Sequence, residues 1–338
     1  MRVVEIGEDW DFDHIRLAER PEPEPGPGEV KLKMAAAAIN YRDYLMVRRG
    51  YGRMSGSLPL VPLSDGVGRV VRLGEGVSRV QVGDRVCPLF NQMWLHGPFR
   101  DELWGGLLGG PLDGVMQEYM VLPAAGVAPA PAHMTDLEAA TLPCAALTAW
   151  SAVVNAGRVK AGDWVLVQGT GGVSLFALQI AKMHGARVVA TSSSEAKLER
   201  LRALGADHVL NYGEVEDWGR AAHQVTAGRG VDIVVEVGGA ATIAQSVRAV
   251  RASGTISLIG NVGGSKAEIN LPLVFMKSAR MIGISTGNRD SFEAMARGMS
   301  ATSLRPVIDD RVHGFEDVRA ALQSLPQGRH FGKVCLQF

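Results

Sequence analysis

Short apolar runs separated by glycine and proline dominate the chain up to about Val127. Runs such as Glu29–Met34, Gly68–Leu73 and Asp84–Phe90 have the length and residue types of β-strands, with turn-forming residues between them. Short strands with frequent turn signals predict a small β-barrel or sandwich. The segment 90–117 is rich in glycine and has no regular period, so it is predicted to be a functional or a disordered loop.

From about Ala139, β-branched apolar runs alternate with stretches of helical period. The run Trp164–Gln168 is predicted to be a strand, and Val173–His184 a helix, because its apolar residues recur at helical spacing. Alternation of this kind predicts βαβ units and a doubly wound parallel sheet. The other predicted elements are the strands Arg187–Thr191, His208–Leu210, Asp232–Val237, Thr255–Gly260 and Arg280–Ser285, and the helices Glu195–Leu204 and Phe292–Ser300.

Composition narrows the class of protein. A length of 338 residues suggests about two domains. Lys and Arg together number 35, as do Asp and Glu, and this zero net charge weighs against nucleic acid or an anionic membrane as a partner. Three widely spaced cysteines suit a reducing compartment. Because we find no secretory signal and no apolar run of about 18 residues, we expect a cytoplasmic protein without a membrane partner.

A glycine-rich turn joins the strand predicted at 164–168 to the helix that follows it. Gly169 would allow a tight turn, and Gly171 would let a pyrophosphate approach the backbone at the helix N-terminus. The third glycine of the dinucleotide fingerprint is replaced by Ser174, which is also small. The alternative is an ordinary glycine-rich turn, but the strand–turn–helix context favours a dinucleotide site. We predict that this site includes Gly169, Thr170, Gly171, Gly172 and Val173.

The end of the next predicted strand indicates which dinucleotide binds. An NAD-binding enzyme usually has an acid about 20 residues beyond the glycine turn. This chain has Ser192 and Ser193 there, followed by Lys197. Hydroxyl groups and a cation suit the 2′-phosphate of NADP(H), which an acid would repel. The alternative is that Ser194 only caps the next helix and that Lys197 is solvated.

Several segments resemble the medium-chain dehydrogenase/reductase superfamily, which includes alcohol dehydrogenases and quinone oxidoreductases. The resemblance covers nearly the whole chain and is carried by Ala38–Asp43, Gly66–Asp84, Leu142–Trp150, the Gly169 turn and His330–Val334.

This resemblance implies an α/β protein with two domains. A GroES-like β-barrel catalytic domain, 1–140 and 288–338, would be interrupted by a Rossmann dinucleotide-binding domain with a doubly wound parallel sheet, 141–287. Related enzymes pair edge strands across a two-fold axis, so we expect a homodimer formed through 280–285. The resemblance also implies cofactor contacts from Thr148, Asn211, Tyr212, Val237, Gly260 and Lys333.

The resemblance places most zinc ligands of the alcohol dehydrogenases at residues that do not hold zinc. The first Cys position is Asn40, the His-acid pair is Ser64-Asp65, and only the last Cys is kept, as Cys144. Amide and hydroxyl groups are not usual zinc ligands. The segment 90–117, where a structural zinc lobe would fall, contains no Cys. We therefore expect no zinc and no other metal, with Cys144 packed as a small buried residue.

The segment Asn40-Tyr41-Arg42-Asp43 resembles that of zinc-free quinone and enoyl reductases in this superfamily. The resemblance implies hydride transfer from NADPH to a small molecule, either an activated alkene (an enone or enal) or a quinone. The enolate formed from an alkene needs a hydrogen-bond donor at its oxygen and a proton at its α-carbon. We predict Tyr41 for either task, Asn40 as an amide donor and Asp43 as a third catalytic candidate.

Alternatives exist for these residues and for the function. Tyr41 could only line the pocket, and Asp43 could only pair with Arg42 or cap a helix. The protein could instead be a zinc-independent carbonyl reductase or alcohol dehydrogenase. It could also be an NADPH-binding sensor or structural protein with little catalysis.

Overall fold

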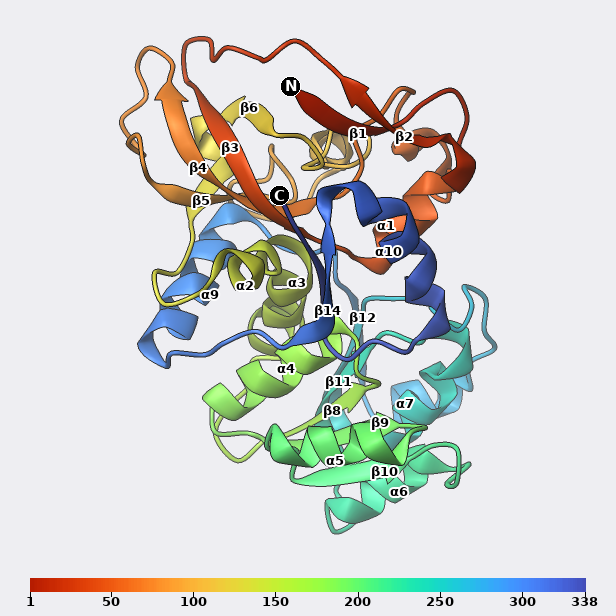
Figure 1. Cartoon of the computed structure of the whole chain (residues 1–338). Coiled ribbons are helices and arrows are strands. Elements are labelled where there is room, and N and C mark those ends of the chain that lie inside the picture. Colours follow the sequence, from red (N-terminus) through yellow and green to blue (C-terminus); the bar gives the residue numbers. More distant parts are fainter. The chain divides into compact units, whose positions relative to one another are not determined.

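The structure is a computed structural model that describes every residue from Met1 to Phe338. The chain forms two compact units (Figure 1). The first consists of Met1–Leu147 and Gly287–Phe338, and the second of Thr148–Thr286. The predicted β domain interrupted by an α/β domain is therefore confirmed. Residues 141–147 belong to the first unit, although the sequence placed them in the second.

A seven-stranded sheet forms the framework of the first unit. Its strands are β3 (Glu29–Ala38), β4 (Asp65–Leu73), β5 (Arg85–Pro88), β6 (Tyr119–Pro123), β7 (Val127–Pro129), β14 (Ile308–Gly314) and β15 (Lys333–Gln337). The order is β14-β15-β3-β4-β5-β7, and β6 also pairs with β3. The other elements are β1 (Arg2–Ile6), β2 (Ile15–Glu19), α1 (Tyr41–Val47), α2 (Asp136–Ala140), α9 (Arg289–Ala301) and α10 (Val318–Ser324).

The long strand β3 organises this sheet. It pairs with β4 along one edge, whereas its other edge pairs first with β6 and then with β15. Val30, Leu32 and Met34, at the spacing of one strand face, pack in the core, and Ala36, Ala37 and Ala38 at its end are all buried. At its C-terminal end, Ala38 lies opposite Asp65 of β4 and opposite Cys335 of β15. Residues from three distant parts of the sequence therefore meet where β3 ends.

The second unit is a six-stranded parallel sheet in the order β10-β9-β8-β11-β12-β13. Its strands are β8 (Trp164–Gln168), β9 (Arg187–Ser192), β10 (His208–Asn211), β11 (Val231–Glu236), β12 (Val250–Leu258) and β13 (Arg280–Gly283). Its helices are α4 (Gly172–Met183), α5 (Glu195–Ala203), α6 (Trp218–Val225), α7 (Ile243–Ala249) and α8 (Leu271–Met276), and α3 (Leu147–Trp150) leads into it.

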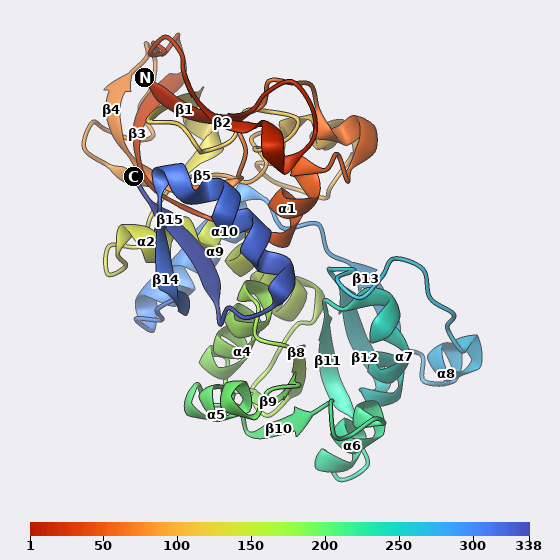
Figure 2. The ribbon, with the colours of Figure 1, turned by 45° about the vertical axis from the view of Figure 1, so that its right-hand side comes forward.

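This sheet is doubly wound, as the sequence predicted. Helices α4 and α5 cover one face, and α6 and α7 cover the other (Figure 2). All five residues of β8 are buried, which explains its continuous apolar run. The chain order reverses beside β8, because β9 lies on one side of it and β11 on the other. Ligands of open α/β sheets bind at the carboxyl ends of the strands at such a reversal.

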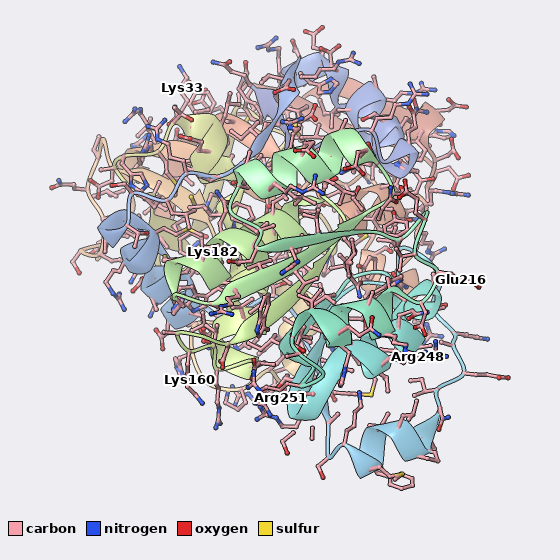
Figure 3. The ribbon with its side chains drawn as sticks, turned by 90° about the horizontal axis from the view of Figure 1, so that it is seen from below. Lys33, Lys160, Lys182, Glu216, Arg248 and Arg251 are labelled. Atoms are coloured by element: carbon pink, nitrogen blue, oxygen red, sulfur yellow. The ribbon has the colours of Figure 1, made fainter.

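Several basic side chains of the second unit are paired with acids. Lys182 and Arg248, both labelled in Figure 3, pair with Asp207 at 2.8 Å and with Asp217 at 3.1 Å. Arg251 is paired in the same way with the buried Asp232.

Among the helices of both units, none is long and apolar enough to cross a membrane.

Candidate functional site

The turn after β8 has the shape of an anion cradle. Gly169 has a φ of +71°, a conformation that favours glycine, and its N–H donates to Thr191 O at 2.8 Å. Gly171 precedes α4, and no side chain caps that helix. A Cβ built on Gly171 would have no atom within 4 Å, so its backbone borders open space. The arrangement fits the pyrophosphate of a dinucleotide, which the N–H groups and dipole of α4 would stabilise.

Ser174 takes over the packing role of the third fingerprint glycine. Its side chain is almost completely buried, and its hydroxyl donates to Gln168 O at 2.6 Å. The bond fastens the first turn of α4 to the end of β8. A serine therefore keeps helix and strand close, as the sequence predicted.

The predicted 2′-phosphate residues lie at neighbouring strand ends. Gln168 lies opposite Thr191, and Asn211 lies opposite Ser192. The sheet thus brings the ends of β8, β9 and β10 together. Exposed side chains available to a ligand here include Ser193 and Tyr212.

Ser192 and Asn211 shape the turns instead. The Ser192 hydroxyl is buried and accepts a hydrogen bond from Ser194 N at 3.2 Å. The Asn211 side-chain oxygen accepts from Gly213 N at 3.0 Å. Ser194 precedes α5, but its side chain makes no capping bond, and Lys197 lies half-buried in the first turn of that helix.

A buried carboxylate that the sequence analysis missed organises the loop after β11. Glu236 is fully buried and accepts from Gly238 N and Gly239 N at 2.9 Å each, and from Gln168 Nε2 at 2.9 Å. The hydroxyls of Thr242 and Ser246 also donate to it. The loop that carries the predicted cofactor residue Val237 is therefore tied to the end of β8. The signal in the sequence that could have revealed Glu236 is its position as an acid at the carboxyl end of a predicted parallel strand.

Gly260 and Thr148 are the remaining predicted cofactor residues of the second unit. A Cβ on Gly260 would lie 2.6 Å from Val237 O, so the loops after β11 and β12 approach closely only because this residue is glycine. Thr148 begins the second unit and is buried.

The start of α1 fixes Asn40, Tyr41 and Asp43. Asn40 N donates to Asp43 Oδ2 at 2.8 Å, and the Asp43 carboxylate is buried. Arg42 Nη1 lies 3.4 Å from Asp43 Oδ1 and donates to Leu108 O at 2.9 Å. Burial raises the pKa of Asp43, and the Arg42 cation opposes this effect. Because Asp43 caps α1 and pairs with Arg42, its contacts are those of a structural residue.

Tyr41 is the first residue of α1 and is half-buried. Its ring contacts that of Tyr44, with centroids 5.8 Å apart. No side chain or backbone group of the chain forms a hydrogen bond with its hydroxyl, which therefore remains available to a ligand.

Lys333 joins Asn40 and Asp65 in a buried cluster at the end of β3. Its Nζ donates to Ile39 O at 2.7 Å and to Asn40 Oδ1 at 2.6 Å, and lies 3.4 Å from Asp65 Oδ2. Lys333 is 3% exposed and Asp65 is 0% exposed. Burial raises the pKa of Asp65 to about 7, although the Lys333 ammonium and the Asn40 amide lower it. The lysine predicted to reach the cofactor thus makes its bonds within the first unit.

The residues at the positions that the resemblance assigns to zinc ligands do not fit zinc. No three His, Cys, Asp or Glu side chains of the chain are grouped to hold a metal. Cys144 is half-buried, not fully buried as expected, and burial of its thiol raises the pKa, which disfavours the thiolate that zinc requires. The Lys333 ammonium lies against Asn40 and Asp65, and this positive charge would repel a metal cation there.

The segment 90–117 forms a lobe of short helical turns and isolated bridges. Asn91 holds its start through bonds from Met93 N and Trp94 N to Oδ1 and from its own Nδ2 to Leu103 O. The rings of Trp94, Phe99 and Trp104 pack edge to face, with centroid distances of 5.0 and 4.9 Å. These three rings form a packed aromatic cluster within the segment.

Comparison with known proteins identifies the family. Residues 26–132 match the model of the alcohol dehydrogenase GroES-like domain, and residues 172–301 match that of the zinc-binding dehydrogenases. A zinc-type alcohol dehydrogenase-like protein of Schizosaccharomyces pombe is 40% identical over 308 residues, which cover 89% of this chain and 88% of that protein. The acryloyl-coenzyme A reductase of Metallosphaera sedula is 29% identical over 313 residues, 89% of each chain.

Solved structures agree with this assignment. A structure described as an NAD-dependent alcohol dehydrogenase has a TM-score of 0.90, 34% identity and full coverage of both chains. The 2-octenoyl-CoA carboxylase reductase CinF, in complex with NADP and 2-octenoyl-CoA, has a TM-score of 0.86 and 27% identity, covering 99% of this chain and 87% of that one. The chain therefore belongs to the medium-chain dehydrogenase/reductase superfamily and is an oxidoreductase, as its sequence indicated.

Proposed function

We propose that the protein is an NADPH-dependent, zinc-independent oxidoreductase that transfers hydride to an activated alkene (an enone or enal) or to a quinone. The observation that carries the proposal is the cluster of Lys333, Asn40 and Asp65 next to Tyr41. It offers hydrogen-bond donors and a fixed cation, but no set of zinc ligands. The names of the acryloyl-coenzyme A reductase and of the CinF complex, both of which refer to α,β-unsaturated thioesters, support the alkene.

The residues of this chain have separate tasks in the proposed reaction. When bound, NADPH would supply the hydride, and the turn Gly169–Val173 would hold its pyrophosphate. Negative charge develops on the carbonyl oxygen of the substrate when the β-carbon accepts hydride, and donors aimed at that oxygen stabilise it. The Tyr41 hydroxyl and the Asn40 amide are the donors available near the start of α1. The α-carbon then takes a proton from Tyr41 or from water.

A panel of enals, enones, quinones and aldehydes assayed with NADPH tests the proposal. We expect turnover of the first three classes. Turnover of aldehydes alone would support a zinc-independent carbonyl reductase or alcohol dehydrogenase, a reading favoured by the NAD-dependent alcohol dehydrogenase neighbour. Tight NADPH binding without any turnover would support a sensor.

Metal content provides an independent prediction. We expect the purified protein to contain far less than one zinc per chain, because Asn40 and Ser64 replace zinc ligands and Lys333 supplies a cation. Elemental analysis measures the zinc, and incubation with a chelator should leave turnover unchanged. Stoichiometric zinc, with activity lost to the chelator, would contradict zinc independence.

The choice of cofactor gives a second prediction. Ser193 is exposed directly after β9, Lys197 lies half-buried in the first turn of α5, and no acid occupies the last positions of β9. Replacing both residues, Ser193→Asp with Lys197→Gln, should shift the ratio of kcat/KM for NADPH over NADH by about tenfold or more toward NADH. The control is Lys160→Gln, an exposed lysine before the amino end of β8. A native enzyme that uses NADH equally well would contradict the assignment.

We also propose a homodimer formed by the edge of the second sheet. β13 is an edge strand, and unpaired edges are commonly covered by a partner. Helix α8, which lies beyond the β12–β13 edge of the sheet in Figure 2, exposes Phe275 by 66% and Met276 by 78%. An exposed apolar surface of this kind is typical of a protein–protein interface, and we propose that a second copy of the chain covers it.

Light scattering should therefore give twice the mass of the chain at micromolar concentration. Phe275→Glu should shift the protein toward the monomer, because a charge would be buried in the interface. Val82→Glu, at an equally exposed apolar residue of the first unit, should leave the mass unchanged. A monomeric native protein would disprove the dimer.

A further inference from the structure

The orientation of the Asn40 amide is decided by Lys333. An ammonium group can only donate hydrogen bonds, whereas an amide has a donor end and an acceptor end. Nζ of Lys333 lies 2.6 Å from Asn40 Oδ1, so the amide oxygen must face the lysine and the Nδ2 end must point elsewhere. Because Lys333 is buried, water does not compete for this bond.

The donor end of the amide makes no hydrogen bond of good geometry. Asn40 Nδ2 is buried, and hydrogen bonding of the Asn40 side chain to the Asp65 carboxyl lowers the pKa of Asp65, so Asp65 is the acceptor that competes with a ligand for this group. Ser64 Oγ and Asp65 Oδ1 are also buried without partners. Unpaired buried polar atoms destabilise a fold, and they persist where a ligand supplies the missing partner. The cluster can therefore form further hydrogen bonds with an atom of a ligand.

The ammonium itself has no donor left for a ligand. Its three N–H groups face three acceptors, Ile39 O, Asn40 Oδ1 and Asp65 Oδ2. A direct contact between Lys333 and a cofactor phosphate would require one of these bonds to break. An indirect role, through the side chain that the lysine holds, requires no such change.

We propose that Lys333 is a positioning residue that holds the Asn40 amide by its oxygen, so that Nδ2 donates a hydrogen bond to a carbonyl oxygen of the bound ligand. The identity of this ligand rests on the proposed function. The oxygen belongs either to the substrate carbonyl or to the carboxamide of the nicotinamide.

Two variants test the role of Lys333 and the role of the amide donor. The double substitution Lys333→Met with Asp65→Asn removes the ammonium without leaving a buried carboxylate unpaired. Asn40→Asp keeps an oxygen for Lys333 but removes the donor. The matched control is Lys31→Met, which removes another buried lysine of the same sheet, paired with Glu22 at 2.5 Å. Circular dichroism and thermal unfolding confirm that each variant is folded, and if the double variant does not fold, Asn40→Asp still tests the donor.

Each variant is assayed for enone turnover and for its dissociation constant with NADPH. If the substrate carbonyl is the acceptor, both test variants should lose about 100-fold in kcat with an NADPH Kd within about threefold of the native value. If the nicotinamide carboxamide is the acceptor, the Kd itself should rise by a similar factor. In either case adding Lys333→Met and Asp65→Asn to Asn40→Leu should cause no further loss beyond that of Asn40→Leu alone, because orientation has no effect once the donor is gone, and this triple variant leaves no buried carboxylate unpaired.

Asp65→Asn alone tests whether the loss in the double variant comes from the misoriented amide or from the broken ion pair. It leaves the bonds from Lys333 to Ile39 and Asn40 in place, so its loss should be at least tenfold smaller than that of the double variant. Native kcat and Kd in the double variant would overturn the proposal, as would equal losses in Asp65→Asn or multiplying losses in the triple variant. If the native protein reduces aldehydes and not enones, the proposed function fails, but the same variants test Lys333 with the aldehyde carbonyl.

Discussion

Replacing Tyr41 by Phe should lower enone or enal turnover by about 100- to 1000-fold, which corresponds to a loss of about 2.7–4 kcal/mol of transition-state stabilisation. The Tyr41 hydroxyl has no partner within the protein, so its removal takes away a donor from the ligand without breaking an internal bond. The phenyl ring of the variant keeps the contact with Tyr44, and stability should change little. A quinone should be affected less, because its reduced oxygens can take protons from water.

The matched control is Tyr44→Phe, one turn further along α1. The Tyr44 hydroxyl accepts a hydrogen bond from Arg48 at 3.1 Å, and its loss should leave turnover nearly unchanged. Steady-state kinetics with one enone and one quinone, together with the Kd of NADPH, distinguish the cases. Full enone turnover in Tyr41→Phe would make Tyr41 a wall of the pocket and would leave water as the proton source.

Replacing Gly171 by Val should weaken NADPH binding by at least about 100-fold, or roughly 2.7 kcal/mol. Gly171 has a φ of −73°, which any residue can adopt, and a Cβ there would touch no other atom of the protein. The variant should therefore fold with nearly native stability. Its side chain would fill the space through which a pyrophosphate reaches the first N–H groups of α4.

Fluorescence titration with NADPH measures this loss, and thermal unfolding of the ligand-free protein checks the fold. Gly105→Val is the control, because Gly105 also borders open space without a left-handed backbone conformation. An unchanged Kd in Gly171→Val would mean that the turn after β8 does not hold the cofactor.

Several elements of the second unit were predictable because their signals are local, whereas the helices α6, α7 and α8 were not predicted. Apolar runs, helical spacing and the glycine turn each lie within a few consecutive residues, and the structure places β8, the turn and α4 where these patterns indicated. Gly169 could be assigned to a tight turn for the same reason. The role of Ser192 was not visible, because only the structure shows that its hydroxyl is buried and bonded to Ser194.

The cluster around Lys333 could not be predicted, because it depends on strand pairing between distant residues. Lys333 and Asn40 are 293 positions apart, and Lys333 and Asp65 are 268 apart. Only the register of β15 and β4 against β3 brings them together. For Asp43, the sequence allowed catalysis, pairing and capping alike, and burial at the start of α1 is what favours the structural roles.

The position of β15 also sets an order of events during synthesis on the ribosome. The second unit is continuous from Thr148 to Thr286, so it can fold as soon as that stretch has emerged. The sheet of the first unit needs β15, which lies between β14 and β3 although it is the last strand made. Its N-terminal strands must therefore wait with an open edge while the whole second unit is translated. The buried cation of the candidate site arrives with this final strand, so the dinucleotide turn can form well before the site around Asn40 is complete.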